Sequence, residues 1–425
     1  MSKKVNLSTV SVIGLGYIGL PTAAMFASRK IKVIGVDVNQ HAVDTINRGE
    51  IHIVEPDLDM VVHAAVAEGY LRAVIQPEPA DAFLIAVPTP FKGSNEPDLS
   101  YVRAASESIA PVLKKGDIVI LESTSPVGTT EQMLQWMAAA RPDLRFPSEG
   151  AEGTNIDIHV AYCPERVLPG HVIRELVEND RIIGGVTEAC ARRAADTYRV
   201  FVEGELLFTN ARTAEMAKLT ENAFRDVNIA FANELSLISD KLDINVWELI
   251  KLANHHPRVN ILQPGCGVGG HCIAVDPWFI VDKNPQEARL IRTARQVNDY
   301  KPDWVLDKVK QAVADLVYSG REEKSITVAM LGLSFKPNID DLRESPALQI
   351  AKNFAAKTCT QLLLVEPNIE ILPKSIADKN LVSVDDAISR ADIVVLLVNH
   401  REFRGIKSKL SMATLVVDAV GIDTV

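Results

Sequence analysis

The sequence predicts an α/β protein in three parts: an N-terminal Rossmann domain at residues 1–210, a central region of long helices at 211–317 and a C-terminal Rossmann-like domain at 318–425. Three observations predict this class. Short apolar runs alternate with helix-like segments in the first and last parts, as in parallel sheets covered by helices. The first apolar run opens onto a glycine-rich turn. Between these parts, apolar residues recur at helical spacing from residue 213 to 237 without Gly or Pro.

The composition is that of an ordinary globular chain, with 47% apolar and 24% charged residues among 425. The net charge of −10 leaves no basic excess to neutralise phosphates, so we predict no nucleic-acid partner. No apolar run approaches the roughly 20 residues that cross a bilayer, so we predict no membrane partner. The five cysteines show no paired spacing and the first residues lead into a strand rather than a cleavable signal, so we expect a cytoplasmic protein.

A dinucleotide-binding βαβ pattern begins the chain. A strand expected at residues 9–13 opens onto a glycine-rich turn, a helix at 20–29 and a second strand at 32–36 that ends in Asp37. The glycines allow a tight turn and let a pyrophosphate approach the helix N terminus. Asp37 would accept hydrogen bonds from ribose hydroxyls and repel a 2′-phosphate, which predicts NAD rather than NADP. The predicted contacts are Gly14, Gly16, Tyr17, Ile18, Gly19 and Asp37.

Three further strands end in polar turns. The strands expected at residues 82–87 and 118–122 lead to Thr89, Thr124 and Thr130. Ligands of a doubly wound sheet bind at the carboxyl ends of strands, so these threonines are candidate NAD contacts, although each could equally cap a helix. A strand at 160–163 ends in Glu165 and Arg166, which could face the site or form a solvated turn. Position alone does not separate these two readings.

The long central helix carries a polar stripe. Lys218, Asn222 and Arg225 follow one another at spacings of four and three, so they share one face. Such a stripe usually faces solvent. Here apolar residues surround it, which makes a ligand-facing role competitive.

A glycine-rich loop follows, with the sequence Pro-Gly-Cys-Gly-Val-Gly-Gly-His-Cys-Ile-Ala-Val-Asp at residues 264–276. Its glycines let the backbone approach a ligand, and the thiol of Cys272 would then be a candidate nucleophile. Taken alone, a turn with two buried cysteines is an equal alternative. The neighbouring His255 and His256 lack the spacing of a zinc site, so we predict no metal.

The last part contains four expected strands, at residues 326–330, 361–365, 391–398 and 414–418. Helical segments separate them, which again predicts a parallel sheet. The turn after the first strand, Gly332-Leu333-Ser334-Phe335-Lys336-Pro337-Asn338, lacks the dinucleotide glycine spacing. This part could therefore hold a nucleotide-like group without being a second NAD site.

Several motifs occur in one order along nearly the whole chain. They are the Rossmann opening, Ser-Thr-Ser-Pro-Val-Gly-Thr-Thr, Cys-Pro-Glu-Arg, Ala-Glu-Met-Ala-Lys-Leu-Thr-Glu-Asn, Gly-Val-Gly-Gly-His-Cys, Phe-Lys-Pro-Asn and Asp-Asp-Leu-Arg-Glu-Ser-Pro. Together they resemble the nucleotide-diphosphate-sugar 6-dehydrogenases, the UDP-glucose/GDP-mannose dehydrogenase family. His271 and the run His-Pro-Arg-Val-Asn-Ile-Leu-Gln-Pro-Gly are similar to members that oxidise UDP-N-acetyl-D-mannosamine for bacterial surface polysaccharides. UDP-N-acetylglucosamine and UDP-glucose are the alternative substrates.

The resemblance implies a four-electron oxidation of a primary alcohol that uses two NAD in sequence and passes through a thiohemiacetal and a thioester at Cys272. It implies a homodimer built on the long helix, with NAD on the first part and the UDP moiety on the third. The implied catalytic residues are Cys272, Lys218, Asn222, Asp276 and Glu165, the last as base for thioester hydrolysis. The implied substrate contacts are Arg166, Val167, Lys218, Asn222, Arg225, His256, Arg258, Gly269, Lys336 and Pro337, and Arg343 is implied to contact the cofactor.

The chain departs from the family pattern at three positions. Val420 stands where a basic residue is common, which puts a C-terminal substrate contact in doubt, and Cys266 and Ala274 replace more usual residues. Two rival readings remain. A two-electron hydroxyacid dehydrogenase would use Lys218 but would not need Cys272. A non-catalytic NAD-binding sensor would use Cys272 as a redox switch.

Overall fold

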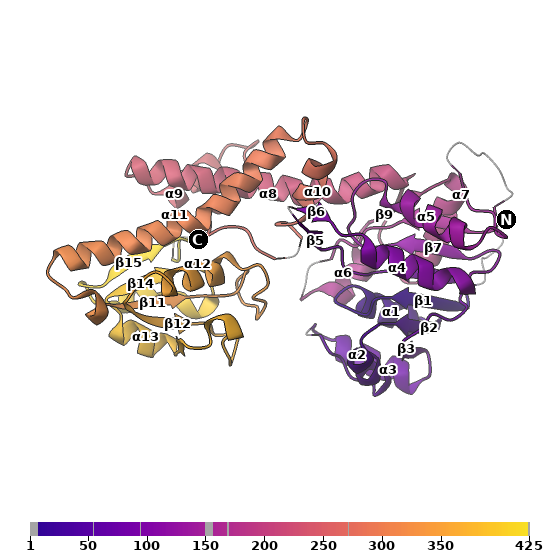
Figure 1. Ribbon diagram of the computed structural model, residues 1–425, viewed down its shortest axis with the longest axis horizontal. Helices are drawn as coiled ribbons and strands as arrows, with labels where there is room; N and C mark the ends of the chain where they lie inside the picture. Colours follow the sequence, from indigo (N-terminus) through magenta and orange to yellow (C-terminus); the bar gives the residue numbers. More distant parts are fainter. Residues whose placement is uncertain are drawn as a thin grey trace. The chain divides into compact units, whose positions relative to one another are not determined.

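The computed structural model describes residues 7–53, 55–93, 95–148, 156–167, 170–270 and 272–423. The chain divides into two compact units, unit 1 (Met1–Thr220) and unit 2 (Glu221–Val425), which are shown in Figure 1. Each unit contains a sheet covered by helices. The predicted α/β class is confirmed, because both sheets have the element order of a Rossmann-like fold.

Unit 1 is built on an eight-stranded sheet with the order β10-β9-β8-β7-β4-β1-β2-β3. The six neighbouring strands β8-β7-β4-β1-β2-β3 are parallel to one another. In contrast, β9 pairs antiparallel with β8, and β10 is parallel to β9. The expectation of a parallel sheet is therefore wrong at this edge. The strands are β1 (Thr9–Ile13), β2 (Lys32–Val36), β3 (Leu71–Val74), β4 (Ala82–Ile85), β7 (Ile118–Leu121), β8 (His159–Tyr162), β9 (Arg181–Gly185) and β10 (Leu206–Asn210). A separate hairpin joins β5 (Phe91–Lys92) to β6 (Glu96–Pro97).

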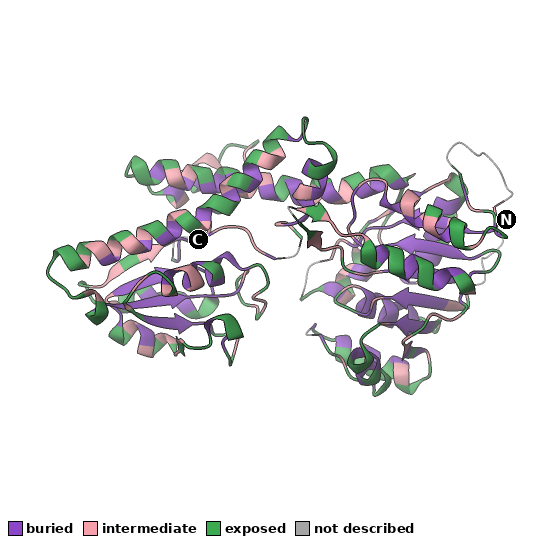
Figure 2. Cartoon of the chain, viewed as in Figure 1, coloured by how far each residue is buried: buried purple, intermediate pink, exposed green. Residues whose placement is uncertain are grey.

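Helices cover both faces of this sheet. One apolar cluster joins strand residues to α1, α2, α3, α6 and α7, and a second cluster joins the sheet to α4 and α5. Burial on both faces explains why the strands are continuous apolar runs, which Figure 2 shows as buried strands between exposed outer helix faces. The helices are α1 (Gly19–Ser28), α2 (Gln40–Asn47), α3 (Leu58–Ala67), α4 (Ser100–Ile109), α5 (Thr129–Ala140), α6 (Val172–Glu178) and α7 (Glu188–Tyr198).

The long helix α8 (Ala211–Lys241) has 31 residues and is longer than the sequence pattern predicted. Its unit 2 half packs along α11 (Arg289–Tyr318), where Arg295 donates to Asp226 at 2.7 Å and Asn233 donates to Asn298 at 2.9 Å. The shorter helices α9 (Val246–Ala253) and α10 (Asp276–Lys283) lie between these two in sequence.

The sheet of unit 2 is parallel, as predicted, and has the strand order β13-β12-β11-β14-β15. The sequence predicted four of these five strands and missed the two-residue strand β13. Apolar clusters lie on both of its faces. None of the described helices is apolar enough over a sufficient length to cross a bilayer. The remaining elements are β11 (Thr327–Leu331), α12 (Pro346–Ala355), β12 (Gln361–Val365), β13 (Asn380–Leu381), α13 (Val384–Arg390), β14 (Ile393–Leu396) and β15 (Leu415–Asp418).

Candidate functional site

The predicted dinucleotide turn joins β1 to α1. Gly14 has a φ of +90°, and a Cβ there would lie 2.7 Å from the carbonyl oxygen of Ala86. A Cβ at Gly19 would lie 1.8 Å from the carbonyl oxygen of Gly14, so the turn closes only with glycine at both positions. A Cβ at Gly16 would meet nothing within 4 Å, which leaves open space for a ligand beside the backbone.

The acidic residue at the end of β2 is tied to this turn. Leu15 N donates to Asp37 Oδ2 at 2.9 Å, and Asn39 N donates to Asp37 Oδ1 at 2.9 Å. Each carboxylate oxygen has a second lone pair, so the half-buried Asp37 can still accept from a ribose. No side chain caps the N terminus of α1, whose N–H groups suit a pyrophosphate. These residues fit NAD.

The three predicted threonine contacts have different surroundings. Thr89 Oγ1 donates to the carbonyl oxygen of Thr124 at 2.6 Å, which joins the ends of β4 and β7. Thr130 is fully buried in the first turn of α5, and its hydroxyl donates to Glu215 of α8 at 2.6 Å. Their contacts with NAD remain predictions.

Glu165 and Lys218 lie together in unit 1. Lys218 Nζ donates to the carbonyl oxygen of Glu165 at 2.7 Å, although 53 residues separate them in sequence. The Glu165 side chain is buried; Arg166 N donates to its Oε1 at 2.6 Å and Arg181 Nη2 to its Oε2 at 2.5 Å. The sequence reasoning missed Arg181. The local sequence shows only that Arg181 is a charged residue at the start of an otherwise uncharged strand.

A second group of predicted residues lies in unit 2. Asn222, one helical turn beyond Lys218 on α8, donates to Asp276 Oδ2 at 2.5 Å, and both side chains are buried. Asp276 opens α10, and its N–H donates to the carbonyl oxygen of Cys272 at 2.9 Å. The turn that carries the exposed Cys272 is thus fixed at its far end.

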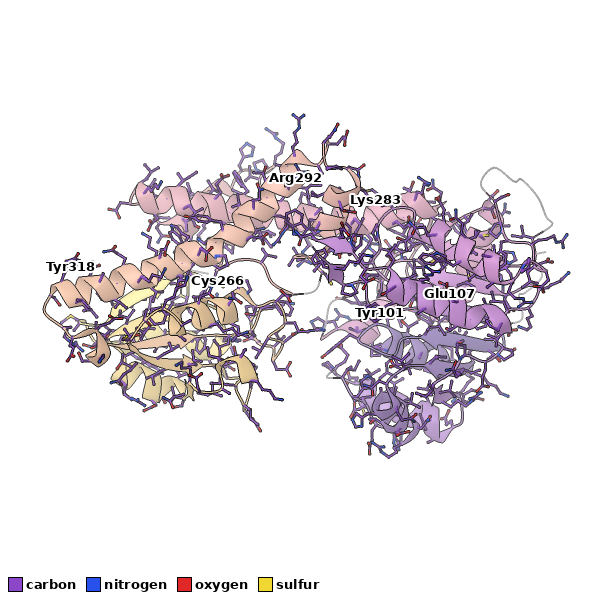
Figure 3. All side chains as sticks on the ribbon, in the orientation of Figure 1. Tyr101, Glu107, Cys266, Lys283, Arg292 and Tyr318 are labelled. Carbon is purple, nitrogen blue, oxygen red and sulfur yellow. The ribbon has the colours of Figure 1, made fainter. Side chains whose placement is uncertain are left out.

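The glycine loop before Cys272 packs closely against the turn after β11. A Cβ at Gly269 would lie 2.4 Å from the carbonyl oxygen of Glu344, and one at Gly270 would lie 2.8 Å from the ring of Phe335. Cys266, labelled in Figure 3, is buried in the unit 2 core, and its thiol donates to the carbonyl oxygen of Leu397 at 3.3 Å. Cys266 therefore packs in the core of unit 2.

Two cations approach each other in unit 2. Burial lowers the pKa of Lys336, and the positive charge of Arg225 lowers it further. Neither side chain forms an ion pair with a carboxylate in the described part of the chain. Cations held together without a carboxylate are typical of an anion site.

The remaining predicted contacts are at the surface. Arg258 N donates to Nδ1 of His256 at 3.3 Å in the exposed turn after α9. Pro337 is exposed, Val167 is half-buried, and Arg343 pairs with Asp341 at 2.6 Å. His271 lies outside the described residues. Within the described ranges no group of three potential metal ligands occurs.

The fold and the glycine turn define a dinucleotide-binding protein. The chain belongs to the UDP-glucose/GDP-mannose dehydrogenase family: the NAD binding domain of that family matches residues 8–202, its central domain residues 212–300 and its UDP binding domain residues 329–424. The family resemblance and the NAD cofactor predicted from the sequence are confirmed.

Similar proteins match over nearly their full length. A UDP-N-acetyl-D-mannosamine dehydrogenase of Yersinia pestis is 64% identical, over 98% of this chain and 99% of that protein. An NDP-N-acetyl-D-galactosaminuronic acid dehydrogenase of Ralstonia nicotianae is 62% identical, over 98% and 97%. Among solved structures, a UDP-D-ManNAc dehydrogenase from Pyrococcus horikoshii is similar with a TM-score of 0.87 and 37% identity, over 97% of this chain and 95% of that one.

Proposed function

We propose that this chain oxidises C6 of UDP-N-acetyl-D-mannosamine to a carboxylate with two NAD in sequence, in the cytoplasm, for a bacterial surface polysaccharide such as enterobacterial common antigen. The observation that carries the proposal is the bond between Asn222 and Asp276, because it fixes the turn that presents Cys272. The name of a relative at 64% identity supports the choice of sugar.

The polar residues of α8 prepare the first oxidation. Lys218 has three N–H donors, of which the Glu165 carbonyl takes one, and Asn222 has two, of which Asp276 takes one. The donors left over stabilise the alkoxide that forms when the C6 hydroxyl loses its proton. The turn between β1 and α1, together with Asp37, would hold NAD, which would supply the hydride acceptor for both oxidations.

Cys272 holds the aldehyde between the oxidations. Its thiolate adds to the aldehyde carbon, and the carbonyl oxygen takes up a proton to give a thiohemiacetal. Loss of that proton and of a hydride leaves a thioester. Water then attacks the carbonyl carbon: one proton goes to Glu165, the C–S bond breaks with its electron pair on Cys272, and the carboxylic acid ionises.

The cations of unit 2 bind the UDP diphosphate in this proposal. Lys336 and Arg225 supply the charge, since neither is neutralised by a carboxylate in the described residues. The other proposed substrate contacts are Arg166, Val167, His256, Arg258, Gly269 and Pro337, and Arg343 is the proposed cofactor contact from the third part.

We also propose a homodimer that pairs along α8. Phe224, Phe231 and Ile238 are spaced by seven residues, so they form one stripe, and they are 67%, 50% and 48% exposed. An exposed apolar stripe of this kind is typical of a protein interface. Light scattering should show that Phe231→Glu is monomeric. The control Tyr318→Glu, at the end of α11 (Figure 3) and 89% exposed, should stay dimeric; a dimeric Phe231→Glu would contradict the pairing.

The test of the activity counts the NADH formed per sugar consumed in excess NAD. The substrates are UDP-N-acetyl-D-mannosamine, UDP-N-acetylglucosamine, UDP-N-acetylgalactosamine and UDP-glucose. We expect two NADH per sugar, with the first substrate preferred. A ratio of one would refute the thioester route and favour a two-electron dehydrogenase. A preference for UDP-N-acetylgalactosamine would instead assign to this chain the activity named for the Ralstonia relative.

Two cysteine variants test the role of the thiol directly. Cys272→Ser should lose turnover and still bind NAD, whereas Cys359→Ser, which removes another exposed thiol, should keep full activity. Activity in Cys272→Ser equal to that of the wild type would remove this thiol from the mechanism.

A further inference from the structure

A buried cluster behind Glu165 is not used by the mechanism above. Arg181 lies between two carboxylates: Nη2 donates to Glu165 Oε2 at 2.5 Å and Nη1 donates to Glu122 Oε1 at 3.4 Å. The side chains of Arg181, Glu122 and Glu165 are 4%, 0% and 7% exposed. Tyr198 completes the cluster, since its hydroxyl donates to Glu122 Oε1 at 2.6 Å and its ring centroid lies 4.3 Å from the guanidinium of Arg181.

The sheet topology brings these residues to the carboxyl ends of the parallel strands, where ligands of such sheets bind. Glu122 directly follows β7, and Glu165 follows β8 by three residues, so both lie at carboxyl ends of parallel strands. Arg181 is the first residue of β9, which runs antiparallel to β8, so the beginning of β9 lies at the same edge. Tyr198 ends α7, which packs on this part of the sheet.

The cluster holds one arginine and two carboxylates away from water. Burial raises the pKa of Glu122 to about 7; Arg181 opposes this rise, Glu165 adds to it, and the bond from Tyr198 lowers it. Burial also raises the pKa of the neighbouring Cys163, which is therefore a neutral thiol. Glu122 Oε2 has no hydrogen-bond partner among the described residues. Glu122 and Glu165 thus share the single counter-ion Arg181, and together they can take up one proton.

We propose that Arg181 and Glu122 are positioning residues for Glu165, in which Arg181 fixes the carboxylate and Glu122 balances the arginine charge when Glu165 takes up a proton. This inference rests on the proposed function, where Glu165 receives the proton of the hydrolytic water. Without Glu122, protonated Glu165 would leave Arg181 as a buried charge without a carboxylate, which is strongly unfavourable. Thioester hydrolysis, rather than either oxidation, is then the step that slows.

The cluster allows substitutions that keep its shape. Glu122→Gln removes one charge and retains an oxygen for Tyr198, and Arg181→Lys keeps the charge but loses the planar fork. Glu165→Gln is the reference for lost hydrolysis. The control is Arg141→Met. Arg141 directly follows α5, far from the carboxyl ends of the strands, and donates to two backbone carbonyl oxygens.

The experiment uses the full chain with UDP-N-acetyl-D-mannosamine and NAD, and it measures the pH dependence of kcat and the intact mass of enzyme quenched during turnover. We expect kcat to fall about tenfold in Glu122→Gln and about 100-fold in Arg181→Lys. Both variants should accumulate a covalent sugar adduct on Cys272, as we also expect for Glu165→Gln. The acidic limb of the Glu122→Gln profile should move to lower pH, because Glu165 then no longer shares Arg181 with a second carboxyl group.

A positioning role and a purely structural role of Arg181 and Glu122 predict different outcomes. Adding Glu122→Gln to Glu165→Gln should change nothing further, and Arg141→Met should keep the pH profile and adduct level of the wild type. Slower turnover without an adduct, or an unmoved acidic limb in Glu122→Gln, would overturn the inference while leaving the proposed function intact. A wild type that forms no NADH with any of the four UDP-sugars would overturn both.

Discussion

Glu215 offers the sharpest test of how α8 is anchored in unit 1. This fully buried carboxylate accepts from Gly128 N at 2.6 Å, from Thr130 N at 2.8 Å and from Thr130 Oγ1 at 2.6 Å, so it caps the N terminus of α5 from another helix. Glu215→Ala leaves three donors without a partner. At about 1–3 kcal/mol for each buried unsatisfied group, with partial relaxation, the unfolding free energy should fall by about 3–6 kcal/mol. Glu215→Gln keeps one oxygen and should cost about 2 kcal/mol.

The control lies in the same turn of α5. Glu131 pairs with Arg212 of α8 at 2.6 Å, but both side chains are partly exposed, so Glu131→Gln should cost about 0.5 kcal/mol. Urea denaturation followed by circular dichroism measures the losses, and hydrogen exchange of Thr129–Ala140 shows whether α5 loosens locally. Equal losses for Glu215→Gln and Glu131→Gln would refute the capping argument.

Two further predictions concern acid stability and the glycine turn. Burial alone would raise the pKa of Asp81, but hydrogen bonds from Ser8 and Lys114 lower it to about 2. Its stabilisation is therefore complete above about pH 4 and is lost as the pH falls to 2, by about 1 kcal/mol after allowance for its partial exposure. Acid titration of urea midpoints should show this loss in the wild type and not in Asp81→Asn; parallel curves would contradict it. Gly19→Ala should unfold unit 1, because its Cβ meets a carbonyl oxygen, whereas Gly16→Ala should fold normally and bind NAD more weakly by calorimetry. A folded Gly19→Ala with normal NAD affinity would contradict the turn geometry.

The strands were predictable because both faces of each sheet are covered. Continuous apolar runs then mark the strands, and β1, β2 and β12 occupy the predicted residues. The limits of the long helices were less predictable, since helix ends depend on local caps. The division at residues 210 and 317 into three parts remains a prediction, although α8 begins at Ala211 and α11 ends at Tyr318.

Strand direction was not predictable from local pattern. The direction of β9 is set by its pairing with β8, and an apolar run reads alike in either direction. For the same reason Arg181 escaped notice, because its partners Glu122 and Glu165 are 59 and 16 residues away in sequence. The resemblance supplied Glu165 as a base, but only the structure shows which side chains hold it.

The two units have the same backbone hydrogen-bond pattern in the turn that follows the first strand of each sheet. In unit 1, Gly14 N donates to the carbonyl oxygen of Val36 at 2.8 Å, and the following N–H binds Asp37. In unit 2, Gly332 N donates to the carbonyl oxygen of Val365 at 2.8 Å, and the following N–H binds Glu366 at 2.7 Å. The third part therefore has the geometry of a dinucleotide turn without its glycine spacing, which the sequence could not reveal.

The two acids differ in what surrounds them, and this difference separates their roles. Asp37 is half-buried and can still accept from a ribose. Glu366 is fully buried, which alone would raise its pKa, but hydrogen bonds from His400 and from the backbone N–H of Leu333 lower it to about 2. His400 in turn accepts from Asn338 N at 2.9 Å, in the turn that carries Lys336. The acid of unit 2 thus holds in place, through His400, the turn that carries Lys336, whereas Asp37 of unit 1 still has lone pairs that face outward from the turn.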